Sequence, residues 1–167
     1  LNNWNVGKVI AMEQMFRNCL LFNQPLNTWN VTKVNWMREM FNRCKSFNKP
    51  LNTSENPIKK HGKTYKAWDT TNVKSMRKMF QYCKRFNQPL NKWDVSNVTW
   101  MDYMFMGCTY FNQNLSTWDV CKVTDKTWTF FATAMLKNYI PKWDEPCKEN
   151  ETGTTSWTYS SPFAVPW

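Results

Sequence analysis

Cysteine, methionine and histidine are the residue types in this chain that could hold a metal ion or act as a nucleophile, with six, ten and one copies among 167 residues. Several of them lie in the phrase "MFRNCLLFNQPLNTWNV" at residues 15–31, which is followed by the related phrases "MFNRCKSFNKPLN", "MFQYCKRFNQPLNKWDV" and "MFMGCTYFNQNLSTWDV". A motif written four times along a short chain is more typical of architecture than of an active site. The recurring cysteine position is occupied by Cys19, Cys44, Cys83 and Cys108.

Packing is the stronger interpretation of this cysteine row. Equivalent residues of stacked repeats lie about 4.8 Å apart and point the same way, whereas a disulfide needs converging Cβ atoms about 3.8 Å apart. Zinc needs four ligands that converge tetrahedrally, which parallel positions do not provide. We therefore expect buried free thiols at this position and no metal site. Cys121 and Cys147 lie outside the row, and the sequence leaves open whether they form a disulfide or stay free.

The methionines, tryptophans and asparagines follow the same repeat. Soft-metal binding would need thioethers that converge on one point, so a methionine row predicts core packing rather than a copper site. The tryptophans are expected to stack in the core. The asparagine after each recurring phenylalanine is expected to bond buried backbone groups and its own counterparts. These structural positions are Met12, Met15, Met37, Met40, Met76, Met79, Met101, Met104, then Trp4, Trp29, Trp68, Trp93, Trp118, and Asn23, Asn48, Asn87, Asn112.

Signals for catalysis are weak. The single histidine, His61, lies between lysines and is expected to be a solvated loop residue. The sequence has no glycine-rich phosphate loop, no Ser-His-Asp set and no carboxylate pair at a recurrent spacing. We expect a protein that is not an enzyme, with no catalytic, cofactor-binding or metal-binding residues and no cofactor.

The elements that position these side chains follow from the repeat itself. Leu1, Leu26 and Leu51 are 25 residues apart, as are Leu90 and Leu115, and a 14-residue insertion lies at 53–66. Within one unit the apolar residues Val34, Met37, Met40, Phe41 and Cys44 are spaced as on one face of a short helix. Asn30, Asp94 and Asp119 are expected to cap such helices, and Asp69 is read in the same way. The proline-containing segment between helices leaves room for one brief strand.

The predicted fold is therefore α/β, a right-handed, leucine-rich-repeat-like solenoid of about five coils of ~25 residues, each with a short strand and a short helix. Residues 1–141 form this repeat domain, with its insertion at 53–66, and 142–167 form a non-repeat tail or cap. No stretch reaches the length of a membrane span. The chain starts within a repeat unit at Leu1, which suggests a processed or partial piece of a longer protein.

The phrases "MFNRCKSFNKPLN" and "FNQPLNKWDVSNVTWM" resemble the repeats of mycoplasma-type surface lipoproteins of unknown function, a branch of the BspA-like leucine-rich-repeat proteins that also occurs in protists and large DNA viruses. The resemblance covers residues 1 to about 131 outside the insertion. In that family the small residue after Met-Phe is commonly alanine, where this chain has cysteine. The resemblance implies a solenoid used for adhesion or assembly at surfaces, and it supplies no catalytic residues.

Residues that the repeat does not explain are the candidates for partner contact. Exposed aromatic side chains are favoured in interface cores, although packing against a neighbouring loop is an equal alternative. The net charge of +10 is scattered over variable positions apart from "KKHGKTYK" at 59–66, so no specific nucleic-acid partner is expected. The candidate contacts are Trp36, Trp100, Tyr82, Tyr103, Tyr110, Lys59, Lys60, Lys63, Lys66, Trp157 and Tyr159.

Two functions remain open from the sequence. The first is a structural or protein-interaction module that is displayed at a cell surface or associated with a virion (capsid), with other proteins as partners in a large assembly. The second is an adhesin-like module that binds host-cell glycan or matrix, with an anionic glycan held by the basic insertion. The glycosylation sequons would be used only on a secretory route, and four of them fall on repeat positions with structural uses. They start at Asn30, Asn52, Asn97, Asn114 and Asn150.

Overall fold

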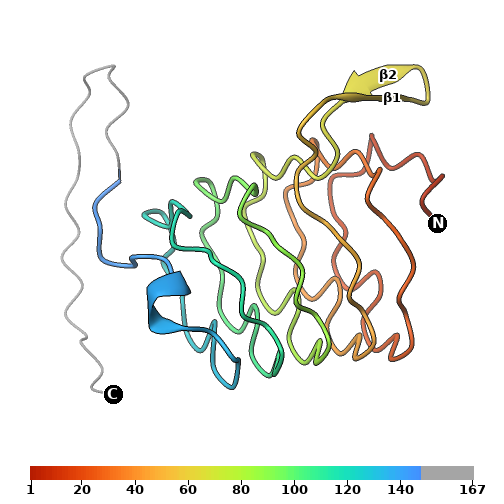
Figure 1. Ribbon diagram of the computed structural model, residues 1–167. Coiled ribbons are helices and arrows are strands. Elements are labelled where there is room, and N and C mark those ends of the chain that lie inside the picture. Colours follow the sequence, from red (N-terminus) through yellow and green to blue (C-terminus); the bar gives the residue numbers. More distant parts are fainter. Residues whose placement is uncertain (148–167) are drawn as a thin grey trace, which may run out of the picture.

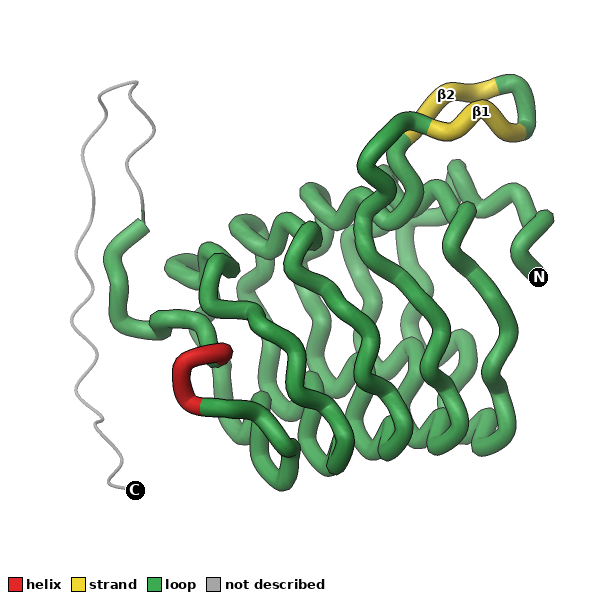
Figure 2. The backbone as a smooth tube through the Cα atoms, in the orientation of Figure 1, coloured by secondary structure: helices red, strands yellow, loops and turns green. Residues whose placement is uncertain are grey.

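The computed structural model describes residues 1–147, which wind into coils that lie side by side along one axis (Figures 1 and 2). Three short elements stand out from the turns. Strands β1 (Ile58–Lys60) and β2 (Lys63–Tyr65) pair antiparallel in a hairpin that projects from one edge of the stack. The 3₁₀ helix η1 (Lys137–Tyr139) lies at the C-terminal end of the stack.

The predicted α/β leucine-rich-repeat-like class is wrong. Residues 1–147 contain no α-helix, and the two strands belong to the insertion rather than to the repeat. The segment from Val34 to Cys44, for which we predicted a helix, consists of turns and one bridge. Neighbouring coils are joined there by isolated parallel bridges, one after another along the stack: Ala11 to Trp36, Trp36 to Ser75, Ser75 to Trp100 and Trp100 to Asp125.

Alternating hydrogen bonds explain why this segment is not helical. The backbone N–H of Gln14 donates to the Arg38 carbonyl of the next coil at 2.9 Å, whereas the N–H of Arg17 donates to Gln14 in its own coil at 3.0 Å. A helix would keep all of these bonds within one coil. The alternation requires two residues with positive φ in every coil, which end each turn before a helix can form. They are Gln14, Glu39, Lys78, Tyr103 and Trp128 at the first position, and Asn18, Arg43, Tyr82, Gly107 and Ala132 at the second.

The core consists of rows of equivalent side chains along the stack. Phe41 stacks on Phe80 with ring centroids 5.5 Å apart, and Phe80 stacks on Phe105 at the same distance. The indole N–H of Trp68 donates to the Leu26 carbonyl of the preceding coil at 2.8 Å. The same bond recurs for Trp29, Trp93 and Trp118. Each coil is therefore bonded to its neighbour through the core as well as through the backbone.

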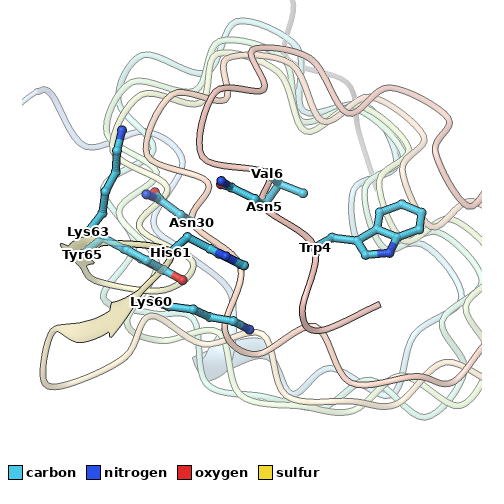
Figure 3. Close-up of a pocket in the computed structure, with 8 residues that line it drawn as sticks. All are labelled: Trp4, Asn5, Val6, Asn30, Lys60, His61, Lys63 and Tyr65. Carbon is cyan, nitrogen blue, oxygen red and sulfur yellow. The ribbon is translucent and has the colours of Figure 1, made fainter.

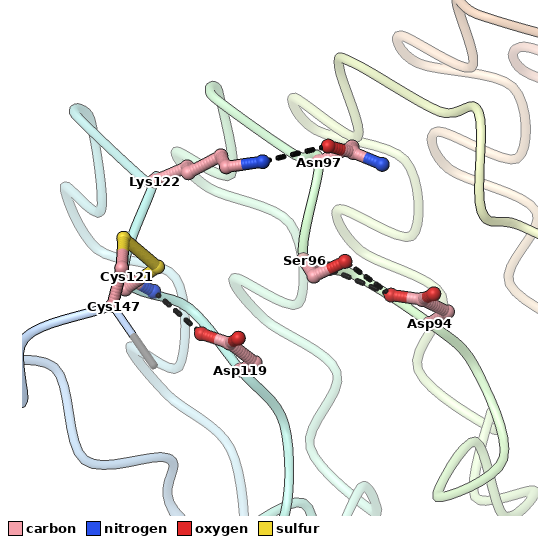
Figure 4. The surroundings of a disulfide bond; sticks show 7 residues. All are labelled: Asp94, Ser96, Asn97, Asp119, Cys121, Lys122 and Cys147. Atoms are coloured by element: carbon pink, nitrogen blue, oxygen red, sulfur yellow. Dashed lines mark hydrogen bonds between the residues drawn. A yellow bond between two sulfur atoms is a disulfide. The ribbon is translucent and has the colours of Figure 1, made fainter. Parts of the chain in front are cut away.

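The asparagines and aspartates serve turns rather than helix caps. The Asn48 side-chain oxygen accepts from the Asn87 backbone N–H at 3.0 Å, and Asn87 does the same for Asn112 at 2.9 Å. The predicted caps close tight turns with the residue two positions on. For example, the Asp94 carboxylate accepts both the N–H and the hydroxyl of Ser96 (Figure 4). Asn30 and Asp69 do the same, and Asp119 accepts the N–H of Cys121.

A partial sixth copy, which the sequence analysis missed, covers part of the last full coil. Ile140 and Trp143 follow Leu115 and Trp118 by 25 residues. Trp143 packs on Phe130 with ring centroids 6.1 Å apart, as Trp93 packs on Phe80 at 6.1 Å. The chain then reaches Cys147, which forms a disulfide with Cys121 (Figure 4). The described start of the predicted tail thus packs against its own last coil, and 148–167 lie outside the described residues.

Gly107 tests the positive-φ requirement. Its φ is +72°, and a Cβ there would lie 2.5 Å from the Tyr82 ring of the preceding coil. We expect Gly107→Ala to lower the free energy of unfolding by about 2–4 kcal/mol, from backbone strain together with overpacking. Gly62→Ala is the matched control, because Gly62 has φ +70° and open space around it. It should cost only about 1 kcal/mol in chemical denaturation.

A second substitution separates the two causes. Tyr82→Ala in the Gly107→Ala background removes the clash and leaves the backbone strain. We expect the double variant to recover part of the stability lost by Gly107→Ala. Equal losses for Gly107→Ala and Gly62→Ala would show that the Tyr82 ring does not press on this position.

Candidate functional site

Two tryptophans from coils that are not neighbours meet at the surface. The rings of Trp36 and Trp100 lie 6.1 Å apart with 31° between their planes, although the coil that carries Ser75 lies between them. Ser75 is only 5% exposed, because the two indoles lean together over it. Trp36 and Trp100 remain 38% and 41% exposed. The sequence placed both tryptophans among the candidate contacts, and the structure brings them together.

Charged pairs lie two and three residues beyond these tryptophans. The Arg77 Nε lies 2.9 Å from an Asp102 carboxylate oxygen, and the Glu39 carboxylate lies between Arg17 at 3.2 Å and Arg38 at 3.4 Å. The carboxylate side chains are only 1% and 6% exposed, whereas the arginine side chains are 41–46% exposed. The guanidinium groups therefore form the outer layer of this surface and the carboxylates the inner one.

The Arg77–Asp102 pair is held by charge rather than by an aligned hydrogen bond. Neither Asp102 oxygen has a hydrogen-bond donor within the described part of the chain, although Arg77 lies beside it. Burial raises the pKa of Asp102, and the charge of Arg77 opposes that rise. A buried carboxylate without full solvation destabilises the fold unless a cation compensates it.

The candidate tyrosines divide between this surface and another one. Tyr82 and Tyr103 are half-buried and occupy positive-φ positions, with Arg43 and Lys78 over their rings at 5.7 and 5.3 Å. Tyr110 is 67% exposed and lies six residues after Met104, beyond the turn segment. We call the surface of Trp36, Trp100, Arg38, Arg77 and Tyr103 the aromatic face.

The basic insertion does not form a single patch. The strand register pairs Lys60 with Lys63 and Lys59 with Thr64, so Lys59 lies on the other face of the hairpin. The Lys60 ammonium is tied to the body of the protein by the Asn2 carbonyl and the Thr28 hydroxyl. Lys59, Lys63 and Lys66 are exposed. Three of the four predicted lysine contacts are therefore available to a partner, on different sides of the hairpin.

A small hollow lies between the hairpin and the first two coils (Figure 3). Its volume is about 10 Å³, which suits a single water molecule. It is lined by Trp4, Asn5, Val6, Asn30, Lys60, His61, Lys63 and Tyr65. His61, expected to be a solvated loop residue, is exposed at the hairpin turn. A hollow of this size has no room for an organic substrate.

The cysteine row carries free thiols. Cys44, Cys83 and Cys108 are buried, while Cys19 in the first coil is exposed. Each buried thiol donates to a phenylalanine carbonyl of the preceding coil at 2.9 Å. Burial raises the pKa of Cys44 to about 12 and that of Cys83 well above its usual value. These thiols stay protonated at neutral pH, which disfavours nucleophilic or metal-binding roles.

Within residues 1–147, no three His, Cys, Asp or Glu side chains gather in an arrangement that suits a metal ion. No helix in that range is long and apolar enough to span a membrane. The candidate contacts Trp157 and Tyr159 lie outside the described residues.

The model of a family described as "Mycoplasma protein of unknown function, DUF285" matches residues 1–61 and 55–158. The chain belongs to this family. The mycoplasma-type part of the resemblance is thereby confirmed, and the match runs through the partial sixth copy. Comparisons with curated proteins and with solved structures gave no match.

Sequence reasoning missed the inner layer of the aromatic face. Glu39 and Asp102 occupy variable positions where acidic residues are normally solvated, and nothing in their spacing indicated burial. Ser75 was also overlooked. A small residue at the position held by tryptophan in the flanking copies was the available signal, because it leaves room for two large rings to meet.

The buried Asp102 carboxylate is expected to make the stability of the fold depend on pH. Because burial raises the folded-state pKa of Asp102, the fold holds the proton more tightly than the unfolded chain. The stability gained from that proton is present at low pH and is lost as pH rises through the raised pKa. We expect Asp102→Asn to remove this fall in the free energy of unfolding, as measured by chemical denaturation at a series of pH values.

Arg77→Met provides the contrast. It leaves the Asp102 carboxylate buried without its cation and should cost about 3 kcal/mol at neutral pH and less in acid. Arg43→Met is the control, since Arg43 is exposed and forms no ion pair within residues 1–147. Equal losses for the two arginine variants would contradict this account of the pair.

Proposed function

We propose that the protein is a non-enzymatic interaction module that binds another protein through the aromatic face. The observation that carries this proposal is the Trp36–Trp100 pair, which keeps two indoles partly exposed in a fixed arrangement. Tryptophan, tyrosine and arginine are the residue types most enriched among the hot spots of protein interfaces. The aromatic face contains all three types.

The backbone under the aromatic face supports this use. Trp36 and Trp100 both take part in the parallel bridges that join the coils. The Met37 and Met101 side chains that follow them are fully buried in the core. A partner therefore meets side chains whose positions are already set, which lowers the entropy lost on binding.

The charges favour an acidic partner surface. Arg38 and Arg77 expose their guanidinium groups, while the carboxylates that hold them lie inside. Partner carboxylates would meet planar donors suited to bidentate bonding, next to an indole pair suited to an apolar side chain. Complementary charge of this kind contributes mainly to specificity and to the rate of association.

We further propose that this binding serves an assembly at a cell surface or in a virion. The resemblance to surface lipoprotein repeats supports this location, and so does the Cys121–Cys147 disulfide, because such bonds persist in oxidising surroundings. The narrower assignment to the BspA-like branch also stays a proposal. The repeat phrases support it.

Removing the indole pair tests the proposal. Tagged wild-type protein, produced in its source organism, is expected to co-purify with a protein partner at fixed stoichiometry that survives raised salt. Trp36→Ala together with Trp100→Ala should weaken that complex by at least about thirtyfold, as one hot-spot tryptophan is typically worth about 2 kcal/mol or more. Both side chains are partly exposed, so circular dichroism and thermal unfolding should stay close to wild type.

Tyr110→Ala is the matched control, because it removes a more exposed aromatic ring outside the aromatic face. It should leave the complex intact. A photo-crosslinking residue at position 36 should label the partner, and one at position 110 should not. Full retention of the partner by the double tryptophan variant would refute the proposal.

A second candidate function is supported by the hairpin. Lys59, Lys63 and Lys66 are exposed on an element that projects from the stack, as in an adhesin-like module that binds anionic glycan or matrix (Figure 1). The split arrangement of these lysines favours a long flexible polyanion over a compact ligand. Such binding rests on charge and is screened by salt.

Salt dependence separates the two candidates. If the hairpin is the site, binding to immobilised heparin should fall steeply between low and physiological ionic strength. Lys59→Ser with Lys63→Ser should then abolish it, while Lys45→Ser with Lys84→Ser, which removes two exposed lysines of the coils, should not. Equal weakening by both pairs would indicate attraction by net charge alone and would argue against a hairpin site.

A further inference from the structure

The fourth copy of the repeat ends in two departures that together form a glycosylation sequon. The position before each recurring leucine is proline in three copies, Pro25, Pro50 and Pro89, and the fourth has Asn114. The position after that leucine is asparagine in the other copies, whereas after Leu115 it is Ser116. The repeat sequence Pro-Leu-Asn has thus become Asn-Leu-Ser, an acceptor sequence for N-linked glycan.

The geometry presents the Asn114 amide nitrogen to solvent. Leu115 is fully buried and fixes the backbone, while Asn114 itself is exposed. The Asn114 side-chain oxygen accepts from the Ser116 N–H at 3.0 Å and from its hydroxyl at 2.7 Å. The side-chain nitrogen donates to no acceptor within residues 1–147. Neither asparagine nor serine is required here by the repeat.

In the other described sequons, the side-chain nitrogen of the asparagine is less accessible. The Asn52 side-chain nitrogen donates to Asn91 at 3.0 Å, and that of Asn97 donates to the Thr71 carbonyl at 2.9 Å. The Asn30 nitrogen lies 3.2 Å from where a Cβ on Gly7 would be, and Asn30 is half-buried in the hollow between the first two coils and the hairpin. Of these four asparagines, Asn114 is thus the exposed one, whereas Asn30, Asn52 and Asn97 are half-buried. The sequon at Asn150 lies outside the described residues.

The disulfide gives an independent indication of the compartment. Cys121 lies five residues after Ser116 and is joined to Cys147 across the end of the stack (Figure 4). Disulfides form on the secretory route and in other oxidising surroundings, which are also where N-linked glycans are attached. An oxidised cysteine pair and an open sequon thus occur in adjoining coils.

We infer that Asn114 is an acceptor site for an N-linked glycan. The co-reactant is a lipid-linked oligosaccharide activated as a sugar diphosphate. The Asn114 side-chain nitrogen forms a bond to C1 of the first sugar, and the bond from C1 to the diphosphate oxygen breaks. The lipid diphosphate leaves with the electron pair, and the amide nitrogen gives one proton to a base of the transferase. This site does not depend on the proposed partner face.

Secretion of the full chain from a eukaryotic cell line tests the inference. Peptide mapping after enzymatic release, which converts each glycosylated asparagine to aspartate, reads every sequon separately. We expect Asn114 to be modified in most secreted molecules, and Asn30, Asn52 and Asn97 in few. Ser116→Ala should remove one glycan from the intact mass, and Ser116→Thr should keep it.

The variant Asn114→Pro with Ser116→Asn restores the repeat sequence and serves as the folding control. It should lack the glycan and unfold at the same temperature as the enzymatically deglycosylated protein. The inference is overturned if secreted, folded protein carries no glycan at Asn114. It is equally overturned if the glycan at Asn114 prevents folding while the restored variant folds.

Discussion

The direction of alternate backbone hydrogen bonds is the constraint on which the rest of the structure depends. In the turn segment of each coil, one N–H bonds within its own coil and the next one bonds to the neighbouring coil. Phe80 donates to Met104 of the next coil at 2.9 Å, and Gln81 donates back to Lys78 at 3.2 Å. Half of the backbone bonding of this segment is therefore intercoil. A single coil leaves these groups unpaired, so coils are stable only as a stack.

This constraint also sets the spacing of the side-chain rows. Because the backbone bonds repeat in register, each Trp, Phe, Cys and Asn meets its counterpart one coil away. The Cys108 thiol and the Trp118 indole both find carbonyl acceptors in the coil before them. The thiols and indole N–H groups of the core are thus satisfied by the same register that stacks the apolar rings. The reactive-looking residue types are accounted for by packing.

Much of the core arrangement could be predicted from the sequence, because equal spacing implies equal environment. The predicted helix was wrong for a physical reason. Apolar residues spaced by three and four positions, as in Met37, Met40 and Phe41, can line the buried side of successive tight turns as well as one face of a helix. The positive-φ positions decide between the two. Most of them carry residues such as Glu39 and Tyr103, and glycine stands only at Gly107, so the sequence signal for left-handed backbone was weak.

The candidate site was predictable as a set of residues but not as an arrangement. Trp36 and Trp100 could be picked out because the repeat does not require them. Their contact depends on the small Ser75 between them, and the sequence analysis did not connect a serine with two distant tryptophans. Lys60 was wrongly predicted to be a partner contact. Its ammonium donates to the Asn2 carbonyl and the Thr28 hydroxyl and anchors the hairpin on the first two coils.

Equivalent core side chains pack on one another from coil to coil, which indicates that functional residues are to be sought at the surface. A core side chain such as Phe80 packs on equivalents in the coils on both sides, so a change there disturbs three coils at once. Surface positions carry no such coupling. The bridge position holds alanine, tryptophan, serine, tryptophan and aspartate in successive coils while the backbone bridge is kept. The fold therefore tolerates variation at this position, and what the tryptophans contribute must come from contacts that the stack itself does not need.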